Sequence, residues 1–276
     1  MTTPVLVLEE NTHGRDIIIG DLHGMVPVLR TLLAEIGFDD TVDRLISVGD
    51  LIDRGAFNEE AIALLDEDWF YAVRGNHEQF LIDSMTDKGT QQLWFRNGGH
   101  WAETVAQEQL QAYADKLDKL PYLIELRSAE RLIGVTHADP PPNWSWLQLK
   151  SALSNNDPTE QEAKEIDYIK ENLLWSRLRI NNKIDDPVIG VSRVFIGHTI
   201  VSEYSALGNV VYLDTGAFIA QNVTGEPPGA VASPVALTAA IIKDGHAVFH
   251  STASFSTIDI APYDPEPDNA KMGYTW

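Results

Sequence analysis

Apolar and polar positions in the first third of the chain alternate between two periods. Short runs rich in Ile, Leu and Val predict strands, and the segments between them place apolar residues at helical spacing. The pattern predicts strands at residues 16–19, 44–48 and 69–73 and helices at residues 26–36, 59–65 and 79–85. This βαβαβ order predicts parallel strands joined by crossover helices. The loops after such strands meet at one edge of the sheet, where α/β proteins bind ligands.

The rest of the chain has weaker periodicity. It predicts a helix at residues 101–117, a strand hairpin at 122–126 and 131–136, a proline-rich loop at 139–143 and a polar helix at 158–174. It also predicts late strands at 193–196, 210–213, 235–242 and 247–250, with a Gly/Pro-rich loop at 224–234. We interpret residues 1–261 as one α/β domain with a helical, cap-like insertion near 143–180, followed by a polar tail at 262–276.

Composition narrows the class of protein. A chain of 276 residues with 44% hydrophobic content can bury a sizeable core. The absence of cysteine excludes disulfides and thiolate metal sites and is compatible with a reducing cytoplasm. Residues 1–10 lack the features of a signal peptide, and no run reaches the ~18 apolar residues of a membrane span. We therefore expect a cytoplasmic protein with no membrane partner.

The formal net charge is −21 at pH 7. Such a charge favours solubility and disfavours nucleic acid as a partner, because both carry negative charge. It also repels phosphate esters. Any phosphate site in this chain must therefore supply its own positive charge.

Five short blocks, each at the end of an apolar run, carry metal-ligand-type side chains. They are Gly20-Asp21-Leu22-His23-Gly24, Gly49-Asp50-Leu51-Ile52-Asp53-Arg54-Gly55, Gly75-Asn76-His77-Glu78, Thr136-His137 and Gly197-His198. One such block alone is usually a turn or a cap. Three blocks after three predicted strands, each with flanking glycine, favour a shared metal site. Two aspartates, three or four histidines and one asparagine amide suit two divalent cations acting on a phosphate ester.

Asp50 is the natural bridge between two cations, because it follows the middle one of the three motif strands. Asp21 and His23 would complete one ion, and Asn76, His137 and His198 would complete the other. This mixed nitrogen and oxygen set favours manganese, with iron, zinc, nickel or cobalt as alternatives, over calcium. A water shared by the ions would have its pKa lowered toward roughly 7, and the resulting hydroxide would attack phosphorus in line.

His77 adjoins Asn76, and neighbouring side chains point apart, so we predict that His77 is a general acid that protonates the leaving oxygen. Asp53 would hold His77 protonated and correctly oriented. Arg54 and Arg74 flank the motifs and would bind phosphate oxygens bidentately. The alternatives are a loop-capping role for Asp53 and a surface ion pair for either arginine.

Two of these blocks, residues 49–55 and Arg74-Gly75-Asn76-His77-Glu78, together resemble the calcineurin-like metallophosphoesterases. The match is closer to the phosphoprotein phosphatase branch, especially the small bacterial and phage (lambda-type) serine/threonine protein phosphatases. It runs from about residue 16 to residue 216. The resemblance implies a four-layer fold in which helices wrap two facing mixed β-sheets. It also implies the metal ligands, the acid pair and the two arginines assigned above.

The same resemblance singles out three further segments. Leu174-Trp175-Ser176-Arg177 looks like a pattern that supplies a third phosphate-binding arginine, so Arg177 is a candidate; the alternative is that it merely ends a helix. Asn97-Gly98-Gly99 resembles a loop that shapes the site. Asp214-Thr215-Gly216 resembles a strand-end motif, and we interpret it as structural.

The sequence therefore predicts a metal-dependent phosphomonoesterase acting on phosphoserine and phosphothreonine, with phosphotyrosine and small aryl phosphates as further substrates. The alternative is a dinucleoside polyphosphate hydrolase, whose symmetrical members typically carry Ala at the position of Asp53 and Asp at that of Glu78. A nuclease is disfavoured by the net charge. A non-catalytic relative would have lost Asp50 or His77, and both are present. The oligomeric state, the metal in the cell and the physiological substrate stay open.

Overall fold

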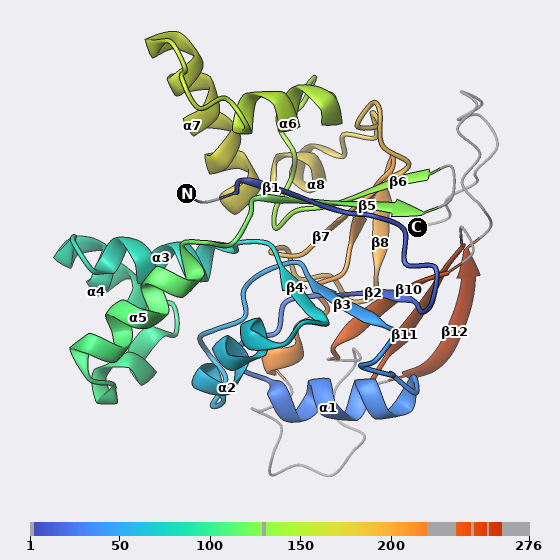
Figure 1. Ribbon diagram of the computed structural model, residues 1–276, viewed down its shortest axis with the longest axis horizontal. Helices are drawn as coiled ribbons and strands as arrows, with labels where there is room; N and C mark the ends of the chain where they lie inside the picture. The colour runs from blue at the N-terminus through green and yellow to red at the C-terminus, as the bar shows by residue number, and fades with distance from the viewer. Residues whose placement is uncertain (1–2, 129–130, 220–235, 244–245, 253, 261–276) are drawn as a thin grey trace.

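The computed structural model describes residues 3–128, 131–219, 236–243, 246–252 and 254–260. Two six-stranded sheets lie face to face, and helices cover their outer sides (Figure 1). Both sheets contain parallel and antiparallel pairs. The predicted α/β fold of two facing mixed sheets flanked by helices is confirmed.

The first sheet contains the predicted βαβαβ unit. Its order is β12-β11-β10-β2-β3-β4. The strands are β2 (Asp16–Ile19), β3 (Arg44–Ser47), β4 (Phe70–Ala72), β10 (Thr238–Lys243), β11 (His246–Ser251) and β12 (Ser254–Ile260). β2, β3 and β4 are parallel neighbours, as predicted, and β10 pairs antiparallel with β2. The carboxyl ends of the three motif strands therefore meet at one edge, with β3 in the middle.

The second sheet has the order β1-β5-β6-β7-β9-β8. The strands are β1 (Val5–Leu8), β5 (Leu123–Ser128), β6 (Arg131–Val135), β7 (Arg193–Ile196), β8 (Ser205–Leu207) and β9 (Val210–Tyr212). β5 and β6 form the predicted antiparallel hairpin, while β6, β7 and β9 run parallel. The carboxyl ends of β6 and β7 therefore lie side by side.

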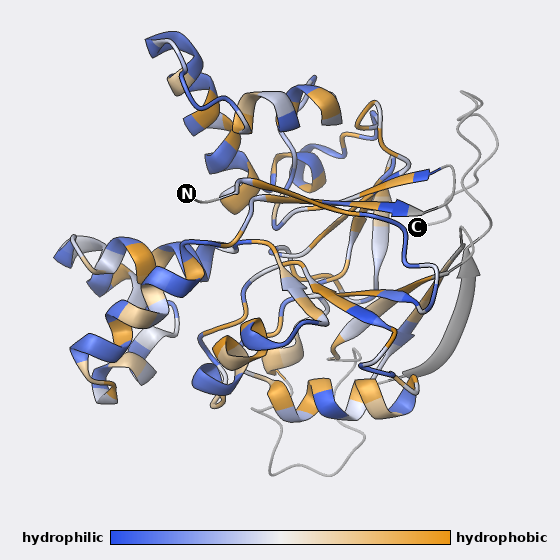
Figure 2. Ribbon diagram, in the orientation of Figure 1, coloured by the Kyte–Doolittle hydropathy of each residue, from blue (hydrophilic) through white to orange (hydrophobic). Residues whose placement is uncertain are grey.

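β2 is buried on both faces, which explains its run of three isoleucines. In β2, Ile18 packs in the layer between the sheets with Ile124 of β5. Ile17 and Ile19 point to the opposite face, where they pack with Leu29 of α1 (Val26–Glu35). Figure 2 shows α1 with hydrophobic and hydrophilic residues alternating along its length. A helix of this kind covers a sheet on one side and faces water on the other.

Two groups of helices complete the layers. The helices between β3 and β5 are α2 (Asn58–Ala63), η1 (Leu64–Asp66), α3 (Asn76–Ser84), α4 (Lys88–Arg96), η2 (Gly99–Thr104) and α5 (Gln107–Leu117). Those between β6 and β7 are α6 (Trp146–Leu153), α7 (Glu160–Trp175) and α8 (Leu178–Asn182). Trp146 and Leu149 of α6 and Leu173 of α7 pack against Val194 and Tyr212 of the second sheet. The region interpreted as cap-like thus contributes an outer layer of that sheet.

The structure corrects several sequence-based boundaries. Asn76 was expected in a loop, but it is the first residue of α3. The single helix expected at 101–117 is divided into η2 and α5, because Val105 and Ala106 adopt extended backbone angles. The pattern did not predict α4, α6, β1, β8 or β12. The loop at 224–234 and the tail at 262–276 lie outside the described residues, so the domain boundaries stay a prediction.

Among the residues that the structure describes, no helix combines the length and apolar character needed to span a bilayer.

Candidate active site

The ends of five strands bring the predicted metal ligands together. Asp21 and His23 follow β2, Asp50 follows β3, Asn76 opens α3 after β4, His137 follows β6 and His198 follows β7. All six side chains are at least nine-tenths buried. Both sheets therefore direct donor atoms to one shared edge, which is the arrangement that the spacing of the motifs predicted.

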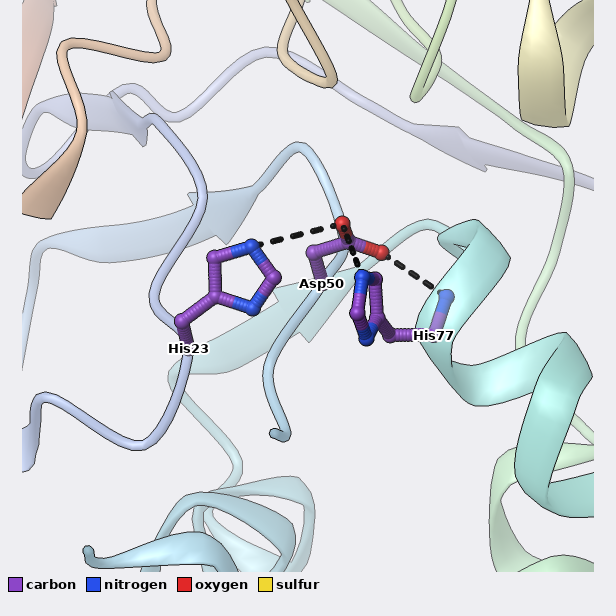
Figure 3. Close-up of side chains that lie close together, drawn as sticks. All are labelled: His23, Asp50 and His77. Carbon is purple, nitrogen blue, oxygen red and sulfur yellow. Dashed lines mark hydrogen bonds and ion pairs between the residues drawn. The ribbon is translucent and has the colours of Figure 1, made fainter. Parts of the chain in front are cut away.

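Asp50 occupies the centre of one half of this cluster. Its Oδ2 lies 3.5 Å from His23 Nε2 and 3.8 Å from His77 Nε2. Figure 3 shows the His23 and His77 rings on either side of the Asp50 carboxylate. Asp50 Oδ1 lies 3.5 Å from His137 Nε2. The carboxylate thus faces histidines from both sheets, as a bridging ligand would.

Asn76 occupies the other half. Its Oδ1 lies 2.9 Å from His137 Nε2 and 2.8 Å from His198 Nδ1. The carboxylate of Asp21 accepts the backbone N–H of His198 at 3.0 Å, which ties the loop after β2 to the loop after β7. Asp50, Asn76, His137 and His198 thus lie within contact distance of one another, and Asp21 is joined to them through the backbone of His198.

The hydrogen bonds around the histidines show that this group suits metal ions. Nδ1 of His23 lies 2.9 Å from the carbonyl of Ile52, and Nδ1 of His137 lies 2.9 Å from that of Val48. A carbonyl only accepts, so each Nδ1 carries the proton and each Nε2 presents a lone pair. Those lone pairs point at oxygens of Asp50, which are also acceptors. Facing acceptors repel one another unless a cation lies among them, and for His23 Nε2 the Arg54 guanidinium, 2.7 Å away, supplies one positive charge. The outer hydrogen bond of each ring to a carbonyl is typical of metal-binding imidazoles.

His198 has the same kind of hydrogen bond to a carbonyl, but the roles of its two ring nitrogens are reversed. Its Nε2 lies 3.1 Å from the carbonyl of Trp175, so its Nδ1 lone pair faces the amide oxygen of Asn76. Burial lowers the pKa of all three histidines, that of His198 to about 3. They are therefore neutral near pH 7, the form in which imidazole binds a metal.

The pKa values of Asp50 and Asp21 are shifted in opposite directions, although burial raises both. Burial would raise the pKa of Asp50, but the neighbouring His137, His77 and His23 outweigh it and hold that pKa low. Burial, followed by repulsion from Asp214 and Asp50, raises the pKa of Asp21 well above its usual value. Several buried carboxylates that lie close together cannot all ionise easily. Divalent cations would remove this penalty, and the donor set therefore fits the metal centre that the sequence predicted.

Glu78 fixes the backbone around Asp50. Its carboxylate accepts the N–H groups of Asp50 at 2.9 Å, Leu51 at 2.8 Å and Gly75 at 2.8 Å. A side chain at Gly75 would collide with Asp50 Oδ1, so only glycine lets these two loops approach. Burial and then the charge of Asp50 raise the pKa of Glu78 to about 7. Sequence analysis placed Glu78 in one of the motifs but did not predict this role.

His77 lies beside the cluster and faces Asp53. Its Nδ1 is 2.6 Å from Asp53 Oδ2. Burial alone would lower the pKa of His77, but Asp50 and Asp53 outweigh it, and the pKa is raised. The indole N–H groups of Trp94 and Trp101 also donate to Asp53, each at 2.7 Å. Sequence reasoning missed both tryptophans, because an isolated indole in an apolar pattern gives no signal beyond core packing.

The predicted arginines lie in different surroundings. Arg54 places one guanidinium nitrogen 2.7 Å from His23 Nε2 and another 3.1 Å from His77 Nε2. The same guanidinium lies over the ring of Phe218. Arg177 donates to the backbone carbonyl of His198 at 3.1 Å. Arg74 turns away from the cluster.

Arg74 donates to the side chain of Asp118 at 2.9 Å, to Gln79 at 3.0 Å and to Tyr122 at 3.2 Å. The structure thus brings Arg54 and Arg177 to the site and does not bring Arg74 there.

Comparisons with known proteins agree with this geometry. A family model described as calcineurin-like phosphoesterase matches residues 15–204. The chain is 35% identical over 210 residues to serine/threonine-protein phosphatase 1 of Salmonella typhimurium, covering 75% of this chain and 88% of that protein. It is 32% identical over 214 residues to serine/threonine-protein phosphatase 2 of the same organism, covering 75% and 89%.

A solved structure of a putative diadenosine tetraphosphatase superposes with a TM-score of 0.58 at 20% identity, covering 90% of this chain and 98% of that one. At this identity the likeness supports the fold alone.

Glu78→Gln is expected to destabilise the protein by about 2 kcal/mol or more, because the new NH₂ group would face backbone N–H donors that the carboxylate now satisfies. Chemical denaturation measures the loss. The matched control is Glu162→Gln at the N-terminus of α7, where a glutamine can replace the glutamate that accepts from Thr159. Equal, small effects of the two substitutions would contradict the role given to Glu78.

Proposed function

The chain belongs to the calcineurin-like phosphoesterase family, and from this premise we propose that it is a metal-dependent phosphatase of phosphoserine and phosphothreonine in proteins. The observation that carries this proposal is the 2.6 Å contact between His77 Nδ1 and Asp53 beside the donor cluster. Asp53 and Glu78 are the two positions at which the phosphatase pattern differs from that of symmetrical tetraphosphate hydrolases. Both side chains have specific buried partners here, which favours a phosphatase over a tetraphosphate hydrolase.

The proposal assigns the donors to two cations. Asp21, His23 and Asp50 would hold one, and Asp50 would share the second with Asn76, His137 and His198. Manganese is the first candidate for both, by the mixed nitrogen and oxygen donor set. When bound, such ions supply positive charge to the phosphoryl oxygens and acidify water.

The side chains beside the cluster would bind and protonate the substrate. His77 would deliver the proton on Nε2 to the leaving oxygen as its bond to phosphorus breaks, while Nδ1–H stays bonded to Asp53. Arg54, which already lies against the His23 and His77 rings, would bind phosphoryl oxygens together with Arg177. We give Arg74 a different role from the one the sequence suggested. Its bonds to Asp118, Gln79 and Tyr122 would hold the start of α3 in place.

A turnover panel tests the proposed function. Phosphoserine, phosphothreonine and phosphotyrosine peptides, p-nitrophenyl phosphate, diadenosine tetraphosphate and nucleotides would be compared at equal concentration with added manganese. We expect the phosphoserine and phosphothreonine peptides to have the highest kcat/KM among the biological substrates. A higher kcat/KM for diadenosine tetraphosphate would reject the proposal and select the dinucleoside polyphosphate hydrolase instead.

His77→Asn is expected to keep its metal but to lose turnover of a phosphoserine peptide by roughly 10²- to 10⁴-fold, the usual contribution of a general acid. The loss should be smaller with p-nitrophenyl phosphate, whose leaving group needs less protonation. The control is His100→Asn, since His100 is exposed and contacts Glu103. Unchanged turnover of the peptide by His77→Asn would show that the acid assignment is wrong.

Asp50→Asn is expected to lose at least one ion, because a neutral amide cannot bridge two cations as a carboxylate does. Metal analysis after gel filtration counts the ions per chain. Asp16→Asn is the control, since Asp16 is also buried at the first sheet but pairs with Arg44. A full complement of two ions in Asp50→Asn would contradict the bridging role.

A further inference from the structure

Asp53 is a buried carboxylate whose side-chain partners are three ring N–H groups. It is 0% exposed to solvent. Trp101 Nε1 donates to Oδ1 at 2.7 Å, Trp94 Nε1 donates to Oδ2 at 2.7 Å, and His77 Nδ1 lies 2.6 Å from Oδ2. Both oxygens are therefore held in fixed directions. A buried carboxylate without such donors would be strongly destabilised.

The chemistry of indole suits this position. An indole N–H only donates, carries no charge and cannot take a proton from a neighbour. Trp94 and Trp101 can therefore orient Asp53 without neutralising it. The negative charge stays available to the His77 imidazole. A lysine or arginine in the same place would compete with His77 for the carboxylate.

The two tryptophans are themselves firmly placed. Trp94 of α4 is fully buried, and a Cβ added to Gly99 would lie 2.5 Å from its ring, so the backbone of this loop packs directly on the indole. The two indole rings are perpendicular, with their centroids 6.2 Å apart. The carbonyl of Gly98 accepts the backbone N–H of Arg54 at 3.3 Å. The segment from α4 to η2 is thus bonded to the loop that carries both Asp53 and Arg54.

The Asp53 backbone also requires outside support. Asp53 and Arg54 have φ angles of 76° and 68°, in the left-handed region that non-glycine residues avoid. Asn58 Oδ1 accepts the N–H of Asp53 at 2.6 Å. Side-chain bonds at both carboxylate oxygens therefore fix the direction of Asp53 within a backbone that would otherwise relax.

We propose that Trp94 and Trp101 are positioning residues for the proton donor: their indole N–H groups aim the Asp53 carboxylate at His77 Nδ1, and so aim His77 Nε2 at the leaving oxygen. This inference rests on the proposed function, in which His77 is the general acid. Both indole N–H groups are bonded to Asp53 and are therefore not free to bind substrate. Loss of an indole N–H acts through Asp53 and His77, so it affects substrates according to how much protonation their leaving groups need.

Trp94→Phe and Trp101→Phe test this inference, because each keeps an aromatic ring and removes the donor. For each variant, kcat for a phosphoserine peptide should fall by about tenfold or more, while kcat for p-nitrophenyl phosphate falls by less than about threefold. KM and the number of bound metal ions should stay unchanged. Trp101→Phe carries the test alone if Trp94→Phe does not fold, since Trp101 is only half-buried.

Trp146→Phe is the matched control. Trp146 is buried, and its indole N–H donates to Glu125 at 2.9 Å, beneath the second sheet and outside the cluster. This substitution removes an indole–carboxylate bond of the same kind. The ratio of kcat for the phosphoserine peptide to kcat for p-nitrophenyl phosphate should equal that of the unsubstituted protein.

A double substitution separates positioning from simple packing. In the His77→Asn background, Trp94→Phe should cause no further loss of peptide turnover, because the acid that it positions is already absent. Equal losses for both substrates, or a full additional loss in this background, would overturn the inference while leaving His77 as the acid. If His77→Asn alone turns over the peptide normally, the proposed acid fails first and this inference fails with it.

Discussion

The structure depends on confining acceptor atoms to a buried space. Asp50 lies against lone pairs of His23 and His137, and the amide oxygen of Asn76 lies against those of His137 and His198. The ring protons of these imidazoles are already given to backbone carbonyls, so they cannot satisfy the facing acceptors. The protein donors nearby are the Arg54 guanidinium beside His23 Nε2 and the His77 backbone N–H on Asp50 Oδ1. Cations would turn each of these repulsions into an attraction. Metal binding would therefore stabilise the folded chain, and rigid loops would hold the donors in place for it.

That rigidity is visible in the backbone. Of the seven non-glycine residues with positive φ among those that the structure describes, five lie in the motifs: His23, Asp50, Asp53, Arg54 and His198. Such residues cost of order 1–3 kcal/mol each and persist only where their surroundings hold them. Here the surroundings are the Glu78 carboxylate, the Asn58 amide and the buried strand that precedes each loop. Strain is thus concentrated where the chemistry is proposed, and the apolar layers between and outside the sheets offset it.

Sequence reasoning located the donors because they follow strands. Residues 17–19 and 45–46 form short apolar runs that lead into short polar blocks, and parallel pairing makes the ends of these strands adjacent. It could not orient side chains whose partners are distant in sequence. Arg74 precedes Asn76 by two residues, but Asp118 takes its guanidinium. Trp94 and Trp101 reach Asp53 from more than 40 residues away. Trp94 does so from α4, a helix that the pattern did not predict, and Trp101 from η2. Local pattern fixes which loops converge, whereas tertiary packing decides which side chains enter the site.

The first turn of α3 shows how few residues are needed to organise such a site. Asn76, His77 and Glu78 are consecutive, and successive residues of a helix project about 100° apart. Asn76 faces His137 and His198 of the second sheet, His77 faces Asp53, and Glu78 turns back to the N–H groups around Asp50. One helix terminus thus supplies a donor to the cluster, the proposed acid and the support for the proposed bridge. A rotation of α3 about its axis would disturb all three together, and for this reason the helices and tryptophans packed around α3 matter to the chemistry as much as the donors themselves.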